Sequence, residues 1–359
     1  MATYTATLGK AERVAYNLRE LYQRYGYAQY KMSKFEEYDL YAKNKSFLQS
    51  SNIITFTDTD GKLMALKPDV TLSIVKNGKD TGDGVRKVYY NENVYRVPRG
   101  DVSYREIMQA GLECMGNIDS YCVVEVLSLA AKSLSEISDQ YVLDVSDIGI
   151  ISSLIDELAA TDEEKREIMT CVGEKNLSAI EKLCAKDESA AATLKALICM
   201  RGDCAEMLEI LKGRACYGAA CELARAVEVL KGQFGSKIRI DFSVTDDARY
   251  YCGIVFKGFV RGIPTAVLSG GRYDGLVRRM KKNGGAIGFA VYLDKIDAID
   301  EISDEYDIDT FVLYSEGDEL AAVYTKVDEL VSAGQRTLAG KIIPERLKYK
   351  TLLKMGGKE

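Results

Sequence analysis

The alternation of apolar and polar residues predicts a helix followed by a hairpin at the start of the chain. Apolar residues recur every three or four positions over residues 8–25, which is typical of an amphipathic helix, and Gly26 is placed to end it. Two short apolar runs, Ile53 to Phe56 and Leu63 to Leu66, flank the sequence Asp58-Thr59-Asp60-Gly61. An Asp-Gly pair between two such runs favours a tight turn, so we expect a β-hairpin.

The next segment predicts a helix and then two long strands. Lys67-Pro68-Asp69 suits a helix N-terminus, and the helix is expected to continue to about Val75. Residues 88–96 and 104–115 have strand character, and Pro98-Arg99-Gly100-Asp101 between them indicates an exposed loop. We expect a helix after Asp119 and a strand over Tyr141 to Val145. Hairpins that alternate with isolated helices indicate an α+β domain on a mostly antiparallel sheet.

The second half of the chain predicts an insertion and an appendage. Strand character is absent over residues 149–234, which indicates a helical insertion, and it resumes at residues 238–242, 251–259 and 265–268. We therefore expect one interrupted core domain over residues 1–297. An acidic linker then precedes a strand at Thr310 to Tyr314, a helix near Glu319 to Val331 and a basic tail, so residues 298–359 are expected to form a short α/β segment.

Composition narrows the class of protein. The chain has 359 residues, of which 47% are hydrophobic and 28% charged, so it can bury a substantial core. It contains no apolar run of the roughly 20 residues that span a membrane, and its N-terminus does not resemble a secretion signal, so we expect a soluble cytoplasmic protein. The net charge of −6 argues against broad binding of nucleic acid. The one basic run, residues 278–282, favours a solvated helix end over a nucleic-acid patch.

The chain contains nine cysteines and no histidine. No two cysteines have CxxC spacing, and the commonest zinc ligand is absent, so we expect no metal site and no cofactor. Reduced thiols buried among helices are the favoured interpretation of the cysteines.

A glycine-rich stretch and the segment ten residues after it carry a family resemblance. Gly270-Gly271-Arg272-Tyr273-Asp274-Gly275-Leu276, followed by residues 286–295, resembles the third signature of class II histidyl-tRNA synthetases. Residues 5–297 are similar to the catalytic core of these enzymes, and closer still to their noncatalytic relative, the regulatory subunit of ATP phosphoribosyltransferase. The resemblance implies a class II aminoacyl-tRNA synthetase-like antiparallel sheet flanked by helices, with a truncated anticodon-binding-like segment at the C-terminal end. In the first signature, Ser33 replaces the proline of the family's dimer interface.

The resemblance also implies a pocket for histidine. Asp69 and Thr71 match the residues that hold the amino group, and Arg96 matches the arginine that grips the carboxylate and the α-phosphate. Gln109 and Glu113 match pocket residues and share one face of a strand with Gly111. The tyrosines that complete the implied pocket are Tyr250, Tyr251 and Tyr273. Taken alone, Asp69 equally fits an acid in the first turn of a helix.

The signatures of the ATP site are degenerate. Asp246 replaces the catalytic arginine, Lys257 replaces a glutamate, and Lys295 replaces the arginine that binds the triphosphate, while Tyr292 replaces a glycine. An anion in place of a cation about 4 Å from the phosphate turns an attraction into a repulsion, each worth about 4 kcal/mol at an effective dielectric near 20. Lysine also lacks the planar fork of arginine. We therefore expect an ATP site that is closed or weak.

These features predict a function without catalysis. We expect a regulatory subunit that binds the short-form catalytic subunit of ATP phosphoribosyltransferase and is linked to feedback by histidine in histidine biosynthesis. The resemblance implies dimers within a hetero-oligomer, and no tRNA is expected to bind. Two alternatives remain open: an active histidyl-tRNA synthetase, and a synthetase-like paralogue that serves another protein or amino acid.

Overall fold

The computed structural model describes residues 8–48, 52–78, 84–97, 102–157, 161–184, 187–200, 202–245, 250–296 and 306–356. The chain divides into two compact units, residues 1–298 and 299–359. Each unit is described by itself below. Within the described residues, no helix is both long enough and apolar enough to cross a membrane.

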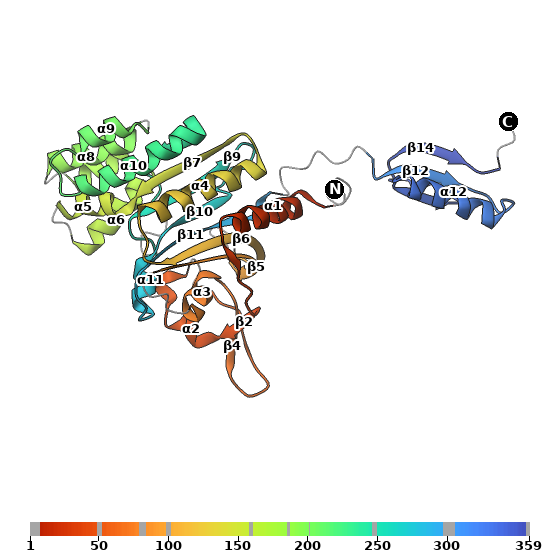
Figure 1. Ribbon diagram of the computed structural model, residues 1–359, viewed down its shortest axis with the longest axis horizontal. Coiled ribbons are helices and arrows are strands. Elements are labelled where there is room, and N and C mark those ends of the chain that lie inside the picture. The colour runs from red at the N-terminus through yellow and green to blue at the C-terminus, as the bar shows by residue number, and fades with distance from the viewer. Residues whose placement is uncertain are drawn as a thin grey trace. The chain divides into compact units, whose positions relative to one another are not determined.

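A large twisted sheet forms the centre of the first unit (Figure 1). Over the described residues it has eight strands in the order β1-β5-β6-β11-β10-β9-β7-β8. The strands are β1 (Ala28–Gln29), β5 (Val85–Arg96), β6 (Arg105–Gly116), β7 (Tyr141–Asp147), β8 (Ile238–Ile240), β9 (Ile254–Val260), β10 (Leu268–Arg272) and β11 (Gly285–Tyr292). The pairs β1·β5 and β7·β8 are parallel and the other pairs are antiparallel, which confirms the predicted α+β fold.

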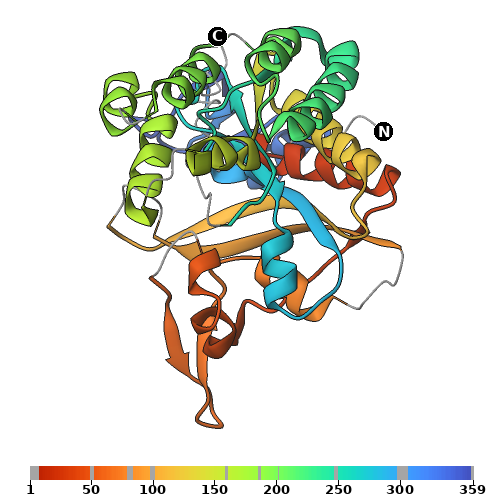
Figure 2. The same cartoon turned by 90° about the vertical axis from the view of Figure 1, so that its left-hand side faces the viewer.

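Helices α1 (Lys10–Arg24) and α4 (Ser120–Ile137) cover one face of this sheet (Figures 1 and 2). Helix α1 buries an apolar stripe that includes Leu18 and Tyr22, and the Tyr22 ring packs edge-on against Phe289 of β11 with 6.0 Å between centroids. Gly26 has a φ of 80°, which lets the chain turn after the helix as the sequence predicts. Asp119 caps α4 by accepting a hydrogen bond of 2.8 Å from the Cys122 amide.

The opposite face carries three short helices and a small sheet (Figure 2). The helices are α2 (Tyr38–Ala42), α3 (Thr71–Asn77) and α11 (Asp274–Arg279), and the sheet β2-β4-β3 comprises β2 (Phe35–Glu37), β3 (Thr55–Thr57) and β4 (Leu63–Leu66). The predicted hairpin is therefore present. The predicted start of α3 at Lys67 is wrong, because the backbone of Lys67 is hydrogen-bonded to Lys34 and Tyr95 in an extended conformation.

A bundle of helices separates β7 from β8. It comprises α5 (Ile148–Glu157), α6 (Asp162–Gly173), α7 (Leu177–Leu183), α8 (Glu188–Cys199), α9 (Cys204–Ile210) and α10 (Tyr217–Phe234). Beyond it, β9 begins three residues later than predicted, because Gly253 has a φ of 90° and interrupts the extended backbone. The predicted strand over residues 265–268 is wrong in position. A loop occupies residues 261–267, and β10 runs from Leu268 through the glycine pair instead.

Over residues 306–356, the second unit is a parallel three-stranded sheet with one helix. Its elements are β12 (Ile308–Leu313), α12 (Leu320–Ser332), β13 (Thr337–Gly340) and β14 (Tyr349–Lys354), and the sheet order is β13-β12-β14. Phe311 and Val312 of the central strand are buried. The strand and helix expected here are present, whereas β13 and β14 were not predicted.

Candidate functional site

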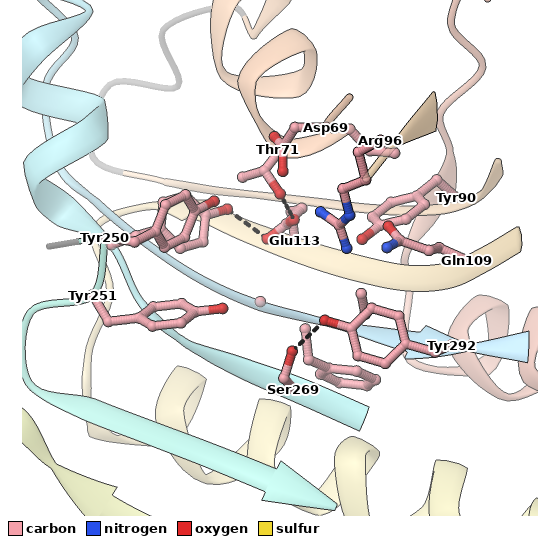
Figure 3. A pocket seen from close by; sticks show the side chains of 15 residues that line it. Asp69, Thr71, Tyr90, Arg96, Gln109, Glu113, Tyr250, Tyr251, Ser269 and Tyr292 are labelled. Carbon is pink, nitrogen blue, oxygen red and sulfur yellow. Dashed lines mark hydrogen bonds between the residues drawn. The ribbon is translucent and has the colours of Figure 1, made fainter. Parts of the chain in front are cut away.

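A small cavity lies over the middle of the large sheet, on the face that carries α3 and α11 (Figure 3). Its volume is about 40 Å³, which is room for about one water molecule. It is lined by Asp69, Val70, Thr71, Tyr90, Arg96, Gln109, Glu113, Tyr250, Tyr251, Ser269, Tyr273, Gly288, Phe289, Ala290 and Tyr292. The site is therefore a small pocket lined mainly by polar and tyrosine side chains.

Strand register places the floor of the pocket. On β6, Gln109 lies opposite Tyr292 of β11 and Glu113 lies opposite Gly288. The same register aligns Gly111 with Ala290, and Ala290 in turn faces Ser269 of β10. Residues spaced by two on these strands point to one side of the sheet, so their side chains collect above its centre.

Glycine is required at the point where the Glu113 carboxyl group lies. A Cβ atom on Gly288 would stand 1.7 Å from Glu113 Oε2 and 2.4 Å from the Leu112 carbonyl oxygen. Gly111 plays the same part for Tyr90, whose hydroxyl oxygen would be 2.5 Å from a Cβ atom there. These two glycines make the space that the polar side chains occupy.

Glu113 joins the two helices above the sheet. The hydroxyl of Thr71, the first residue of α3, donates to Glu113 Oε1 at 2.7 Å, and the phenol of Tyr273, which precedes α11, donates to Oε2 at 2.5 Å. Glu113 is buried, and burial raises the pKa of its carboxyl group to about 8, although both hydrogen bonds oppose that shift. A carboxyl group with this pKa is largely protonated at neutral pH.

Asp69 and Arg96 provide the other charges of the pocket. Asp69 Oδ1 accepts a hydrogen bond of 2.8 Å from the amide of Leu72 and so caps α3. Burial raises the pKa of Asp69, and the nearby guanidinium of Arg96 partly offsets that effect. Arg96 is buried, and among the lining residues it is the one that carries a positive charge.

Tyrosine rings form one wall of the pocket. The ring of Tyr250 lies 4.7 Å from that of Tyr251 and 5.6 Å from that of Tyr273, measured between centroids. Burial raises the pKa of Tyr90, Tyr250 and Tyr273 well above the ordinary value, so these phenols stay protonated as hydrogen-bond donors.

Tyr292 closes the side of the pocket at the end of β11. Its hydroxyl is 2.6 Å from the hydroxyl of Ser269 across the cavity (Figure 3). Lys295 lies behind this tyrosine in the short 3₁₀ turn Leu293–Lys295, with Nζ 4.8 Å from the Tyr292 ring centroid and 2.8 Å from the carbonyl oxygen of Ala266, to which it donates. The Lys295 ammonium group thus binds backbone and does not line the pocket.

The structure brings together every residue that the sequence suggested for a histidine pocket. Asp69, Thr71, Arg96, Gln109, Glu113, Tyr250, Tyr251 and Tyr273 all line the cavity. Asp246, the expected replacement for a catalytic arginine, lies outside the described residues.

The sequence did not assign Tyr90 or Ser269 to the pocket. Tyr90 and Arg96 lie on the same face of β5, because side chains two, four or six residues apart on a strand point to the same side. Tyr90 could therefore have been assigned to the pocket from Arg96. Ser269 was hidden because β10 was expected to end before it.

The arrangement suits a small zwitterion. A guanidinium can pair with a carboxylate, while carboxyl groups, hydroxyls and an amide can accept hydrogen bonds from an ammonium and a second nitrogen group. Such a ligand is larger than the 40 Å³ of the cavity, so side chains of the lining must move to accommodate it.

The antiparallel sheet with its flanking helices and this pocket define a class II aminoacyl-tRNA synthetase-like protein. The family model for histidyl-tRNA synthetase matches residues 4–296, so the chain belongs to the histidyl-tRNA synthetase family. Among curated proteins it is similar to the ATP phosphoribosyltransferase regulatory subunits of Alkaliphilus metalliredigens and Caldanaerobacter subterraneus. The first is 30% identical, with 78% of this chain and 74% of that protein covered. The second is 31% identical, with 77% and 75% covered.

Solved structures show the same fold. A structure described as an ATP phosphoribosyltransferase regulatory subunit/histidyl-tRNA synthetase from Bacillus halodurans matches with a TM-score of 0.74 and 19% identity, covering 96% of this chain and 93% of that chain. A chain of the ATP phosphoribosyl transferase (HisG:HisZ) complex from Thermotoga maritima matches with a TM-score of 0.62 and 19% identity, covering 78% and 96%.

Proposed function

We propose that this chain is the regulatory subunit of an ATP phosphoribosyltransferase and that the catalytic subunit is a separate, short-form chain. The curated relatives with 30% and 31% identity bear the name of that subunit. The subunit acts at the first step of histidine biosynthesis, and histidine bound to it regulates the partner. By linkage, histidine inhibits only if it binds the inhibited assembly more tightly than the active one.

The position of Lys295 carries the noncatalytic part of this proposal. Activation of an amino acid by ATP needs fixed cations around the phosphates. Lys295 instead donates to the Ala266 carbonyl and lies against the ring of Tyr292, which leaves Arg96 as the cation of the described pocket. One guanidinium can hold the carboxylate of an amino acid, but it cannot also neutralise a triphosphate.

Free histidine is the ligand that this lining favours. Arg96 pairs with the carboxylate of the amino acid, and Asp69 with Thr71 receives its ammonium group. Glu113 and Gln109 then face the imidazole, whose two ring nitrogens can donate or accept according to protonation. The protonated form of Glu113 at neutral pH makes either pairing available.

The remaining features of the proposal concern assembly. The chain forms dimers within a hetero-oligomer with the catalytic subunit, and it binds no tRNA. Residues 1–297 form the synthetase-like core, residues 149–234 are an insertion within it, and residues 298–359 are a linker with a truncated anticodon-binding-like segment. The nine free cysteines suit a reducing cytoplasm.

Calorimetric titration with histidine tests the ligand, with the chain alone and with the catalytic subunit present. We expect saturable binding in at least one of the two samples, and a loss of affinity in the variants Asp69→Ala and Glu113→Ala. A parallel assay measures histidine-dependent exchange of pyrophosphate into ATP, and we expect no exchange above background. Exchange at an ordinary enzymatic rate would show that the chain is an active synthetase instead.

A further inference from the structure

A second and larger cleft lies along α2, at the C-terminal ends of α3 and α11. Its volume is about 410 Å³, within the range of ligand-sized sites, and it is formed by α2 with its flanking residues and by the ends of the other two helices. It is lined by Glu37, Asp39, Leu40, Lys43, Asn44, Lys76, Arg279, Met280 and Lys282. None of these residues belongs to the pocket above the sheet.

Positive charge gathers around this cleft although the whole chain carries a net charge of −6. Four lining residues are cations, namely Lys43, Lys76, Arg279 and Lys282, and two are acids, Glu37 and Asp39. Lys43 and Asp39 are both exposed and form an ion pair at 3.0 Å. Such a surface pair contributes about 0–1 kcal/mol, so Lys43 can exchange partners at little cost. Lys76 pairs at 2.9 Å with Glu36, whose side chain is largely buried.

Arg279 and Lys282 hold the helix ends in place. Arg279 Nη2 donates to the carbonyl oxygen of Lys43 at 2.8 Å, and Lys282 Nζ donates to the carbonyl oxygens of Lys76 and Gly78. Each cation therefore caps the C-terminus of a helix other than its own. The shape of the cleft depends on how α3 and α11 are placed relative to α2.

The same two helices begin at the pocket. Thr71 opens α3 and Tyr273 precedes α11, and both donate to the carboxyl group of Glu113. At 1.5 Å per residue, the seven residues of α3 and the six of α11 span only about 10 Å. A ligand that breaks the two bonds of Glu113 therefore acts on the starts of both helices whose ends form the cleft.

A cation–ring contact followed by an edge-to-face ring contact makes a second connection. The guanidinium of Arg279 lies 5.7 Å from the ring centroid of Phe47, and the ring of Phe47 lies 6.0 Å from that of Tyr250 in the pocket wall. A shift of Tyr250 on ligand entry is thus passed through Phe47 to a residue that both lines the cleft and caps α2.

We propose that this cleft is the surface on which the chain receives an acidic segment of the catalytic subunit, and that α3, α11 and Phe47 couple its shape to occupancy of the pocket. The inference rests on the proposed function, because it names the surface through which that regulation acts. Four lining cations stand against Glu37, Asp39 and the nearby Glu36, so the cleft carries a net positive charge that complements such a segment.

Charge reversal tests the surface. The variant Lys43→Glu changes an exposed side chain that forms a solvent-exposed ion pair with Asp39. Lys212→Glu is a matched control on the helical insertion, where Lys212 makes a similar exposed pair with Glu209. Affinity for the purified catalytic subunit is measured at low and at moderate salt. We expect Lys43→Glu to weaken binding on the order of tenfold at low salt, with a smaller loss at moderate salt, and Lys212→Glu to match the parent.

The coupling needs a separate variant. Phe47→Leu removes both ring contacts and keeps an apolar side chain, so the fold is expected to persist, which a thermal melt checks. We expect the factor by which histidine changes the affinity for the catalytic subunit to fall at least about threefold. If the parent binds the catalytic subunit but Lys43→Glu binds it equally well, or if Phe47→Leu keeps the full histidine effect, this inference is wrong and the proposed function stands. If the parent does not bind the catalytic subunit at all, both fail.

Discussion

The phenol of Tyr273 donates a hydrogen bond of 2.5 Å to the buried carboxyl group of Glu113, which also accepts the hydroxyl of Thr71 at 2.7 Å. One carboxyl group on the sheet therefore fixes the start of two helices. An amino acid that takes hydrogen bonds from this carboxyl group has to compete with both of them.

Stability of the unliganded protein is expected to fall with pH through this carboxyl group. Burial raises the pKa of Glu113 from 4.5 to about 8, so the folded state holds a proton that the unfolded state has released. The stabilising contribution is complete below about pH 4.5 and is lost as pH rises through 8. With these two pKa values, the free energy of unfolding should fall by ~2–3 kcal/mol between pH 6 and pH 9. Urea unfolding at several pH values measures this fall.

The matched variant for that experiment is Glu113→Gln, which keeps the shape of the side chain and cannot titrate. Its free energy of unfolding is expected to change less between pH 6 and pH 9 than that of the parent. Equal pH dependence in the two proteins would show that Glu113 titrates normally.

Arg96 is expected to be required for binding the carboxylate of histidine. Loss of a charge-assisted, two-point contact costs about 3 kcal/mol, so Arg96→Lys should weaken histidine binding on the order of a hundredfold while the charge is retained. The control is Arg261→Ala, because Arg261 is exposed and bonds Gln140 at 3.0 Å. Calorimetric titration compares the three proteins, and unchanged affinity in Arg96→Lys would place the carboxylate elsewhere.

Tyr292 is expected to keep ATP out of the pocket. The variant Tyr292→Gly removes the ring that meets Ser269 and enlarges the cavity, so weak binding of ATP should appear where the parent shows none. Tyr292→Phe keeps the ring and loses only the 2.6 Å contact, and it should still exclude ATP. ATP binding by the parent equal to that of the glycine variant would contradict this role. Exchange of pyrophosphate should stay absent in all three, because Lys295 remains bound to Ala266.

A Cβ atom at position 288 is expected to destabilise the fold. In Gly288→Ala the new atom would meet Glu113 Oε2 and a backbone carbonyl within 2.4 Å, which should cost at least about 2 kcal/mol. Gly232→Ala is the control, since Gly232 lies in α10 with nothing within 4 Å, and there alanine should stabilise by roughly 0.5–1 kcal/mol. Chemical denaturation measures both changes. The two substitutions should change the free energy of unfolding in opposite directions. If Gly288→Ala leaves it unchanged, the Glu113 carboxyl group can move aside.

Local chemistry predicted much of this fold. The end of the first helix at Gly26 and the hairpin turn at Gly61 are determined by residues close together in sequence, and both are present. The start of α3 was misplaced because Lys67 is held in an extended conformation by residues far along the chain. The parallel strands β13 and β14 were missed for a similar reason, since each pairs with β12 across a long stretch of intervening chain.

In the pocket, too, the sequence predicted what local patterns determine and missed what long-range contacts determine. Alternation predicted that Gln109 and Glu113 share a face, and the register of β6 confirms it. The closure of the cavity was not predictable, because it depends on Tyr292 meeting Ser269 across two strands and on Tyr273 meeting Glu113 over 160 positions. Such contacts follow from sheet order, which no local pattern contains.

The activity of the catalytic subunit is the measurement that tests the central claim most directly. The short-form ATP phosphoribosyltransferase subunit is assayed alone, with this chain, and with this chain plus histidine, and complex formation is followed by gel filtration. We expect the chain to elute with the catalytic subunit and to raise its activity, and histidine to lower that activity again. Unchanged activity together with separate elution of the two chains would contradict the account.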